Sequence, residues 1–234
     1  NNQEGKLEAI VAAVPFLRDR DLRTSTTAES GLQRIEMIKQ AISKHYAQVG
    51  TGVEALTLKD IPVLATGHLY ASGAIASDKQ DNIYIGDKEN IRADQFPACF
   101  DYVALGHIHR PQLVGGRSNV RYSGSIIPLS FSETKDDKSV YLLEFEGAKL
   151  RSTNPFPIPV FRRLKTIQGD YDTVQQKLLA FAKRHEAELK AWVEVIVESK
   201  KVIPNLSLEL NELVAELNVE LLKVRVARTV NTQT

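Results

Sequence analysis

The sequence predicts an α/β protein in two parts, and three observations support this fold class. Short apolar runs at residues 7–14, 61–66 and 102–105 have the length and composition of buried strands. A helix-like spacing of apolar residues covers residues 30–49. After residue 159 the pattern alternates between strand and helix, which is typical of a parallel sheet with crossover helices.

The first part is predicted to contain one long helix between its strands. Apolar residues three and four positions apart indicate an amphipathic helix over residues 30–49, and Ser30 is a suitable N-cap. Gly50 and Gly52 are expected to end this helix, because glycine commonly follows helix C-termini. Residues 70–100 show little periodicity, so we expect a long functional loop or a linking segment there.

Further strands and a domain boundary are expected before residue 160. The strands cover residues 120–125, 140–145 and 149–151. The last two are expected to form a hairpin that turns at Gly147. Three prolines at alternate positions in residues 154–159 predict a stiff, extended connection. We therefore expect a first domain at residues 1–153 and a second domain at residues 160–234.

The second domain is predicted to be a small α/β cap. Its strands are expected at residues 162–167, 192–197 and 220–226, and its helices at residues 172–189 and 206–217. Each helix connects two strands, which predicts two crossovers of one sheet with both helices on the same face.

Composition indicates an ordinary globular protein and excludes several classes. Hydrophobic residues make up 43% of the 234 residues and charged residues 25%, and the formal net charge is +1. Overall charge therefore does not point to nucleic acid. Cys99 is the only cysteine, which excludes an internal disulfide and a cysteine-rich zinc site and favours a cytoplasmic location. No apolar run approaches the roughly 20 residues of a membrane helix, and the start shows no secretory signal pattern.

Three histidines follow the ends of apolar strands. His68 follows one predicted strand through a glycine, and His107 and His109 follow the next strand through another glycine. Glycine lets the chain bend sharply, and ligands of open α/β sheets bind beyond the carboxyl ends of the strands. Neutral imidazole is a common ligand of first-row metals, so these three side chains are the candidate metal ligands. His45 and His185 lie on predicted helix surfaces and are expected to be ordinary surface or core residues.

Three segments share a pattern with a known family. Residues 65–68 contain Gly-His after a strand, residues 101–110 contain Gly-His-Ile-His after another strand, and residues 121–131 contain Tyr-Ser-Gly-Ser. Residues 14–18 and 84–86 also match connecting segments of that family. Together they resemble the C-terminal half of the calcineurin-like metallophosphoesterases, and more narrowly the bacterial SbcD-like exonuclease subunits. The resemblance covers nearly the whole chain.

The resemblance implies a fold, metals and a substrate. The first domain would be the second half of a four-layer metallophosphoesterase sandwich, and the cap would follow it. His68 and His107 would bind one metal of a two-metal centre, and His109 would bind the other. The metals would be manganese, with magnesium as the alternative, and the substrate would be the phosphodiester backbone of double-stranded DNA ends and hairpins. Two cations about 3.5–4 Å apart can hold a bridging hydroxide and stabilise an in-line displacement.

The sequence departs from the family's pattern at its start. The family's Asp-x-His, Gly-Asp and Gly-Asn-His segments supply the bridging carboxylate and the proton-handling histidine. These segments are absent and would precede Asn1. We therefore expect no catalytic proton-handling residue in this chain, an incomplete metal centre and no activity of the chain alone. A start at Asn1, directly before a strand, suggests a chain cut from a longer protein.

Several polar residues near these corners have weaker interpretations. Arg110 could meet a phosphate or could be an ordinary solvated arginine. Ser123 and Ser125 could orient His107 or His109, or could be plain turn residues at a strand end. In the second domain, basic clusters could contact DNA phosphates or could be exposed charged faces. These clusters are Arg162, Arg163 and Lys165; Lys200 and Lys201; and Lys223, Arg225 and Arg228.

Partners and alternatives follow from the same resemblance. The intact protein would act with an SbcC-like ATPase on DNA and could be a homodimer. However, the chain shows no long C-terminal helical pattern of the kind that the family uses to bind that ATPase. One alternative is another metallophosphoesterase, acting on phosphomonoesters or cyclic nucleotides, which would share the histidines but lack the cap. A second alternative is a non-catalytic scaffold with a vestigial half-site.

Overall fold

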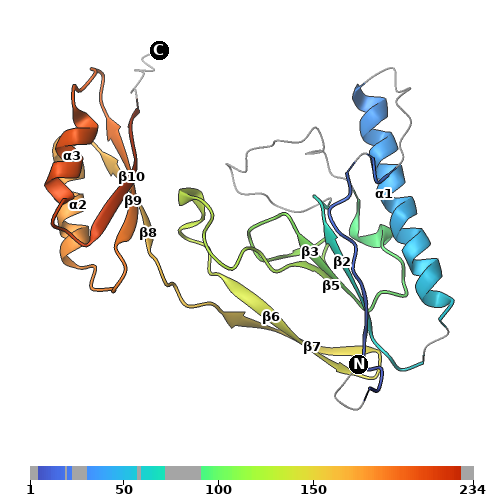
Figure 1. Cartoon of the computed structure of the whole chain (residues 1–234). Coiled ribbons are helices and arrows are strands. Elements are labelled where there is room, and N and C mark those ends of the chain that lie inside the picture. Colours follow the sequence, from blue (N-terminus) through green and yellow to red (C-terminus); the bar gives the residue numbers. More distant parts are fainter. Residues whose placement is uncertain (1–4, 19, 23–30, 57–58, 72–90, 228–234) are drawn as a thin grey trace. The chain divides into compact units, whose positions relative to one another are not determined.

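The computed structural model describes residues 5–18, 20–22, 31–56, 59–71 and 91–227. It confirms the α/β class, and the chain divides into two compact units (Figure 1). Unit 1 contains residues 1–127 and 136–158, and unit 2 contains residues 128–135 and 159–234. No helix among the described residues is both long and apolar enough to cross a membrane.

Unit 1 is built on a five-stranded sheet with the strand order β1-β2-β3-β5-β4. The strands are β1 Ile10–Ala12, β2 Val63–His68, β3 Tyr102–Gly106, β4 Gln112–Val114 and β5 Arg117–Tyr122. The first three strands and β5 run parallel, whereas β4 is antiparallel to β5 and lies at the edge. The sequence does not predict β4, because its three residues are too few to show a period.

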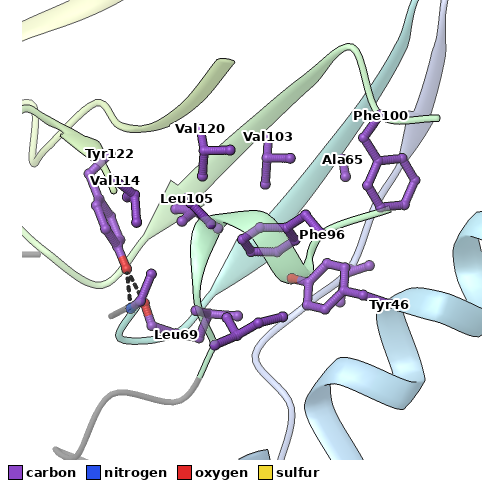
Figure 2. Packing of buried hydrophobic residues seen from close by; sticks show 14 of the residues in the cluster. Tyr46, Ala65, Leu69, Phe96, Phe100, Val103, Leu105, Val114, Val120 and Tyr122 are labelled. Carbon is purple, nitrogen blue, oxygen red and sulfur yellow. Dashed lines mark hydrogen bonds between the residues drawn. The ribbon is translucent and has the colours of Figure 1, made fainter. Parts of the chain in front are cut away.

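Helix α1 (Gly31–Glu54) packs against the core of unit 1 through its apolar side. Figure 2 shows Tyr46 of this helix among the apolar side chains of the sheet. The predicted helix end is wrong, because α1 continues through Gly50 and Gly52. A Cβ on Gly50 would lie 2.8 Å from the Cβ of Pro97. The glycine therefore permits close packing inside the helix and does not end it.

A two-stranded antiparallel sheet completes unit 1. Its strands are β6 (Ser139–Glu146) and β7 (Lys149–Pro157), which are joined by a turn at Gly147 with φ +56°. The predicted hairpin is confirmed, but β7 is much longer than residues 149–151. Pro155 and Pro157 lie within β7. Because alternate residues of a strand direct their N–H groups to the same side, both prolines can occupy the side away from β6.

Unit 2 is a three-stranded parallel sheet with the order β10-β9-β8 and two crossover helices. Its elements are β8 Leu164–Gly169, α2 Tyr171–Lys183, β9 Ala191–Glu198, α3 Leu206–Val214 and β10 Val219–Ala227. Both helices cover the same face of the sheet (Figure 1), and their apolar sides form its core. The predicted strand–helix–strand–helix–strand pattern is confirmed.

Both helices of unit 2 end earlier than the sequence predicts, and α3 ends at Val214 instead of residue 217. The sequence predicts a helix to residue 189, but α2 ends at Lys183. His185 is buried beyond this end, stacks on Phe181 with ring centroids 5.8 Å apart, and has its Nε2 2.9 Å from the carbonyl oxygen of Leu189. His185 is therefore a hydrogen-bonded core residue of the turn after α2, and its predicted position on a helix surface is wrong.

Candidate metal centre

Two candidate metal ligands lie at the carboxyl ends of neighbouring parallel strands. β2 ends at His68, and β3 ends one residue before His107. The register of this strand pair places His68 opposite Gly106. The two imidazole rings meet edge to face, with centroids 5.4 Å apart. The fold therefore brings together side chains that are 39 positions apart in the sequence.

Glycine precedes each histidine corner for a steric reason. A Cβ on Gly106 would lie 3.0 Å from Nδ1 of His68, so a larger residue would press on that imidazole. A Cβ on Gly67 would collide with the hydroxyl of Tyr46. That hydroxyl donates a hydrogen bond of 3.0 Å to the carbonyl oxygen of Thr66. Burial raises the pKa of Tyr46, so the phenol stays protonated and remains a donor.

His107 has a backbone conformation that is strained for any residue except glycine. Its φ is +111°, whereas residues with a Cβ rarely adopt a positive φ. The neighbouring Ile108 is buried in the core of unit 1 and anchors the corner. Strain of this kind costs roughly 1–3 kcal/mol and is concentrated at functional sites. The conformation of His107 therefore supports a functional role for this corner.

His109 is held mainly through its main chain. Its carbonyl oxygen accepts hydrogen bonds from the backbone N–H of Ser125 (3.1 Å) and from the Nζ of Lys138 (3.2 Å). Gly124 has φ +81°, and a Cβ there would lie 2.7 Å from the same carbonyl oxygen. The Tyr-Ser-Gly-Ser segment therefore packs directly on this corner, and glycine is required at the point of closest approach.

The environment of His68 favours its neutral form. Partial burial of the ring lowers its pKa, and the charge of nearby His109 lowers it further. The residue nevertheless keeps an exposed side, and Phe16 contacts its ring edge to face with centroids 5.7 Å apart. Since metals bind neutral imidazole, His68 is in the ligating form around neutral pH.

The three histidines do not make a complete two-metal site. In the described part of the chain, no group of three or more histidine, cysteine, aspartate or glutamate side chains is arranged to hold a metal ion. Imidazoles supply nitrogen donors without negative charge, whereas hard divalent cations also require carboxylate oxygens. The residues that the structure describes therefore do not fit a pair of divalent cations on their own.

The other predicted site residues have protein partners. Arg110 places Nε and Nη2 each 3.1 Å from one oxygen of Asp136. About half of the Arg110 side chain remains exposed, whereas Asp136 is almost covered. Ser125 accepts a hydrogen bond of 2.9 Å from Lys138 through its hydroxyl, and Ser123 is exposed. Ser125 therefore contacts the backbone of the corner, and the role of Arg110 at a phosphate stays a prediction.

Tyr122, the first residue of the Tyr-Ser-Gly-Ser segment, has a supporting role that the sequence does not reveal. Its fully buried hydroxyl donates to the carbonyl oxygen of Leu69 (2.6 Å) and accepts from the N–H of Ala71 (2.8 Å). Figure 2 shows these bonds beside Leu69. The bonds fix the segment that follows His68, including Tyr70, whose ring lies 6.2 Å from that of His107. An aromatic residue in a buried strand predicts core packing, but nothing in the sequence identifies the partners of its hydroxyl.

The basic clusters of unit 2 differ in whether their cationic side chains already have partners within the unit. Lys223 and Arg225 lie 3.6 and 3.4 Å from the buried carboxylate of Glu194. Arg162 stacks on the ring of Trp192 at 4.6 Å and also donates to a backbone carbonyl. These cations are therefore engaged within the unit. Arg228 lies outside the described residues.

A basic groove of about 710 Å³ lies between the edge strand β8 and helix α2. Four cationic side chains line it: Arg163, Lys165, Lys177 and Arg184. In the described part of unit 2, none of the four forms an ion pair. Lys177 donates to the carbonyl oxygen of Gln168 (2.8 Å) and is near Asp170, whereas Arg163 lies over the Phe181 ring. The groove is therefore lined by cationic side chains and, in part, by apolar side chains.

Comparisons with known proteins give consistent matches. The family described as the type 5 capsule protein repressor C-terminal domain, SbcD_C, matches residues 160–234. The SbcD subunit of nuclease SbcCD from Escherichia coli strain K12 is 34% identical over 229 residues, which is 97% of this chain and 56% of that protein. The same subunit of Rhodobacter capsulatus is 36% identical over 168 residues, 68% of this chain and 39% of that protein. The chain thus spans about half the length of the curated relatives that it matches.

Proposed function

Because this chain is SbcD-like over nearly all of its length, we propose that it forms part of the nuclease subunit of an SbcCD-type complex. The intact subunit would hydrolyse phosphodiester bonds at double-stranded DNA ends and hairpins, in DNA repair and recombination. The observation that carries the proposal is the meeting of His68 and His107 at the ends of two adjacent strands. The crevice beyond such strand ends is where ligands of open α/β sheets bind.

In this proposal His68 and His107 bind one manganese ion and His109 binds a second. When bound, such ions supply a nucleophile and charge stabilisation for phosphodiester hydrolysis. The described residues contribute imidazoles and the backbone that orients them, and carboxylates outside the described residues would complete the centre in the intact protein. The chain alone is therefore proposed to be inactive, and we assign it no cleavage step.

The partners proposed for the intact protein are DNA and an SbcC-like ATPase. The names of both relatives describe them as one subunit of the nuclease SbcCD, and hence as part of a complex. A homodimer of the intact protein is also proposed.

Activity of the intact protein on two substrates tests the proposed function. With manganese we expect it to degrade linear duplex DNA and to hydrolyse nitrophenyl phosphate poorly, because unit 2 provides an additional surface for a large substrate. A phosphomonoesterase would show the reverse preference. Rapid hydrolysis of nitrophenyl phosphate together with intact DNA would therefore contradict the nuclease proposal.

The basic groove between β8 and α2 is proposed to contact the phosphate backbone of that DNA. Lysine and arginine side chains without acidic partners can replace the counterions of DNA, and each such contact steepens the salt dependence of binding. Arg163 and Lys165 are suited to this role because they have no ion pair in the described part of unit 2.

We expect the double variant Arg163→Gln, Lys165→Gln to bind duplex DNA more weakly in the intact protein. The slope of log affinity against log salt concentration should fall by about 2, because two phosphate contacts are lost. Fluorescence anisotropy at several salt concentrations measures this slope. The control is Lys44→Gln, Lys149→Gln, which removes the same charge from exposed positions of unit 1 that belong to none of the basic clusters. Equal slopes for the two double variants would contradict the assignment of the groove.

A further inference from the structure

The chain passes between the two units three times. It leaves unit 1 after Ile127, returns at Asp136, and leaves again after Ile158. Within unit 1, Lys138 forms hydrogen bonds to residues next to the first and third crossings, and it lies two residues after the second crossing. Its Nζ donates to the Oγ of Ser125 (2.9 Å), just before the first crossing, and its carbonyl oxygen accepts from the N–H of Ile158 (2.8 Å), just before the third.

Lys138 also contacts the candidate metal centre. The same Nζ donates to the carbonyl oxygen of His109 at 3.2 Å, where the N–H of Ser125 is the second donor. Lys138 is only 6% exposed, which is unusual for a lysine. Hydrogen bonds from a charged donor are stronger than neutral ones, and burial protects them from competing water. The ammonium group therefore fixes the main chain of the His109 corner.

We propose that Lys138 is a positioning residue for His109. Its hydrogen bonds join the carbonyl oxygen of His109 to the segments that lead to the connections between the units. Because these bonds fix the backbone of His109, they also set the direction of its imidazole. Lys138 does not reach the reacting atoms itself. The consequence for metal binding rests on the proposed function, in which His109 is a ligand, whereas the positioning of His109 does not.

The position of the His109 imidazole tests the proposal in the full-length protein. Its ring signals can be followed by NMR after ¹⁵N-histidine labelling. Lys138→Met keeps the volume of the side chain but removes its donors, and we expect it to shift the signals of His109. Lys138→Arg, which retains donors, should recover part of the wild-type spectrum. Ser125→Ala removes one acceptor and should cause a smaller shift, which keeps the test available if Lys138→Met does not fold.

A second readout separates positioning from general stability. The manganese concentration for half-maximal DNA cleavage should rise by roughly 10–100-fold in Lys138→Met, the usual effect of losing a residue that orients a ligand. Val174→Ala removes apolar volume from the core of unit 2, which lowers stability, and it should leave both readouts unchanged.

The results separate the positioning role of Lys138 from the ligand role of His109, which belongs to the proposed function. Unshifted His109 signals in both Lys138→Met and Ser125→Ala would overturn the positioning role. Shifted signals with an unchanged manganese requirement would support positioning and would contradict the role of His109 as a ligand. Shifts of equal size in Val174→Ala would also overturn the proposal, because they would show a general effect of stability.

Discussion

Replacing His107 with alanine in the intact protein is expected to abolish manganese-dependent DNA cleavage while leaving the protein folded. The imidazole lies against that of His68 at the end of β3, where the proposed metal binds. Loss of a direct ligand should exceed the roughly 10–100-fold effect that is typical of residues that only orient a ligand. We therefore expect a loss of more than 100-fold in the cleavage rate of linear duplex DNA at fixed manganese.

Stability should be little affected by His107→Ala. The ring is only partly buried and does not belong to the core of unit 1. Thermal unfolding should therefore occur near the wild-type temperature, which excludes unfolding as the cause of lost activity. His45→Ala is the matched control, because His45 is a histidine of α1 outside the proposed centre. Normal cleavage by His107→Ala, or equal losses in the two variants, would refute the ligand assignment.

Substituting Gly67 with alanine is expected to lower the free energy of unfolding by about 2–3 kcal/mol. The new Cβ would collide with the hydroxyl of Tyr46, which is fully buried between α1 and β2 and has little room to move. Tyr46→Phe removes the colliding oxygen but also loses the hydrogen bond to the carbonyl oxygen of Thr66. That variant alone should cost about 1–2 kcal/mol.

The double variant provides the decisive comparison for this contact. If the hydroxyl causes the cost of Gly67→Ala, adding alanine to the Tyr46→Phe background should be much less destabilising than adding it to wild type. Urea denaturation of the four proteins measures this coupling. Strictly additive free energies would show that Tyr46 does not determine why glycine precedes His68.

Much of the fold could be predicted because its signals are local. The apolar strands that end at His68 and His107 are short runs with clear boundaries, and the strand–helix alternation of unit 2 repeats at regular spacing. The histidine corners could be predicted because glycine, strand end and imidazole are adjacent in the sequence. The meeting of the two corners follows from the parallel register of β2 and β3.

Sequence-based predictions are wrong or silent where the role of a residue depends on distant parts of the chain. Gly50 resembles a helix stop, but it meets Pro97, 47 positions away. Pro155 and Pro157 resemble a linker, yet a strand with one free side accommodates them. Lys138 has no signal of burial in the sequence, because lysine is nearly always exposed. Its role depends on three segments that only the folded chain brings together.

The histidine corners that follow β2 and β3 are proposed to bind the metal ions of the intact nuclease subunit. The most direct measurement is the position of manganese in crystals of the intact protein, located by its anomalous scattering. We expect one peak in direct coordination with the ring nitrogens of His68 and His107, and a second peak coordinated by His109. Manganese bound away from all three imidazoles would contradict this assignment.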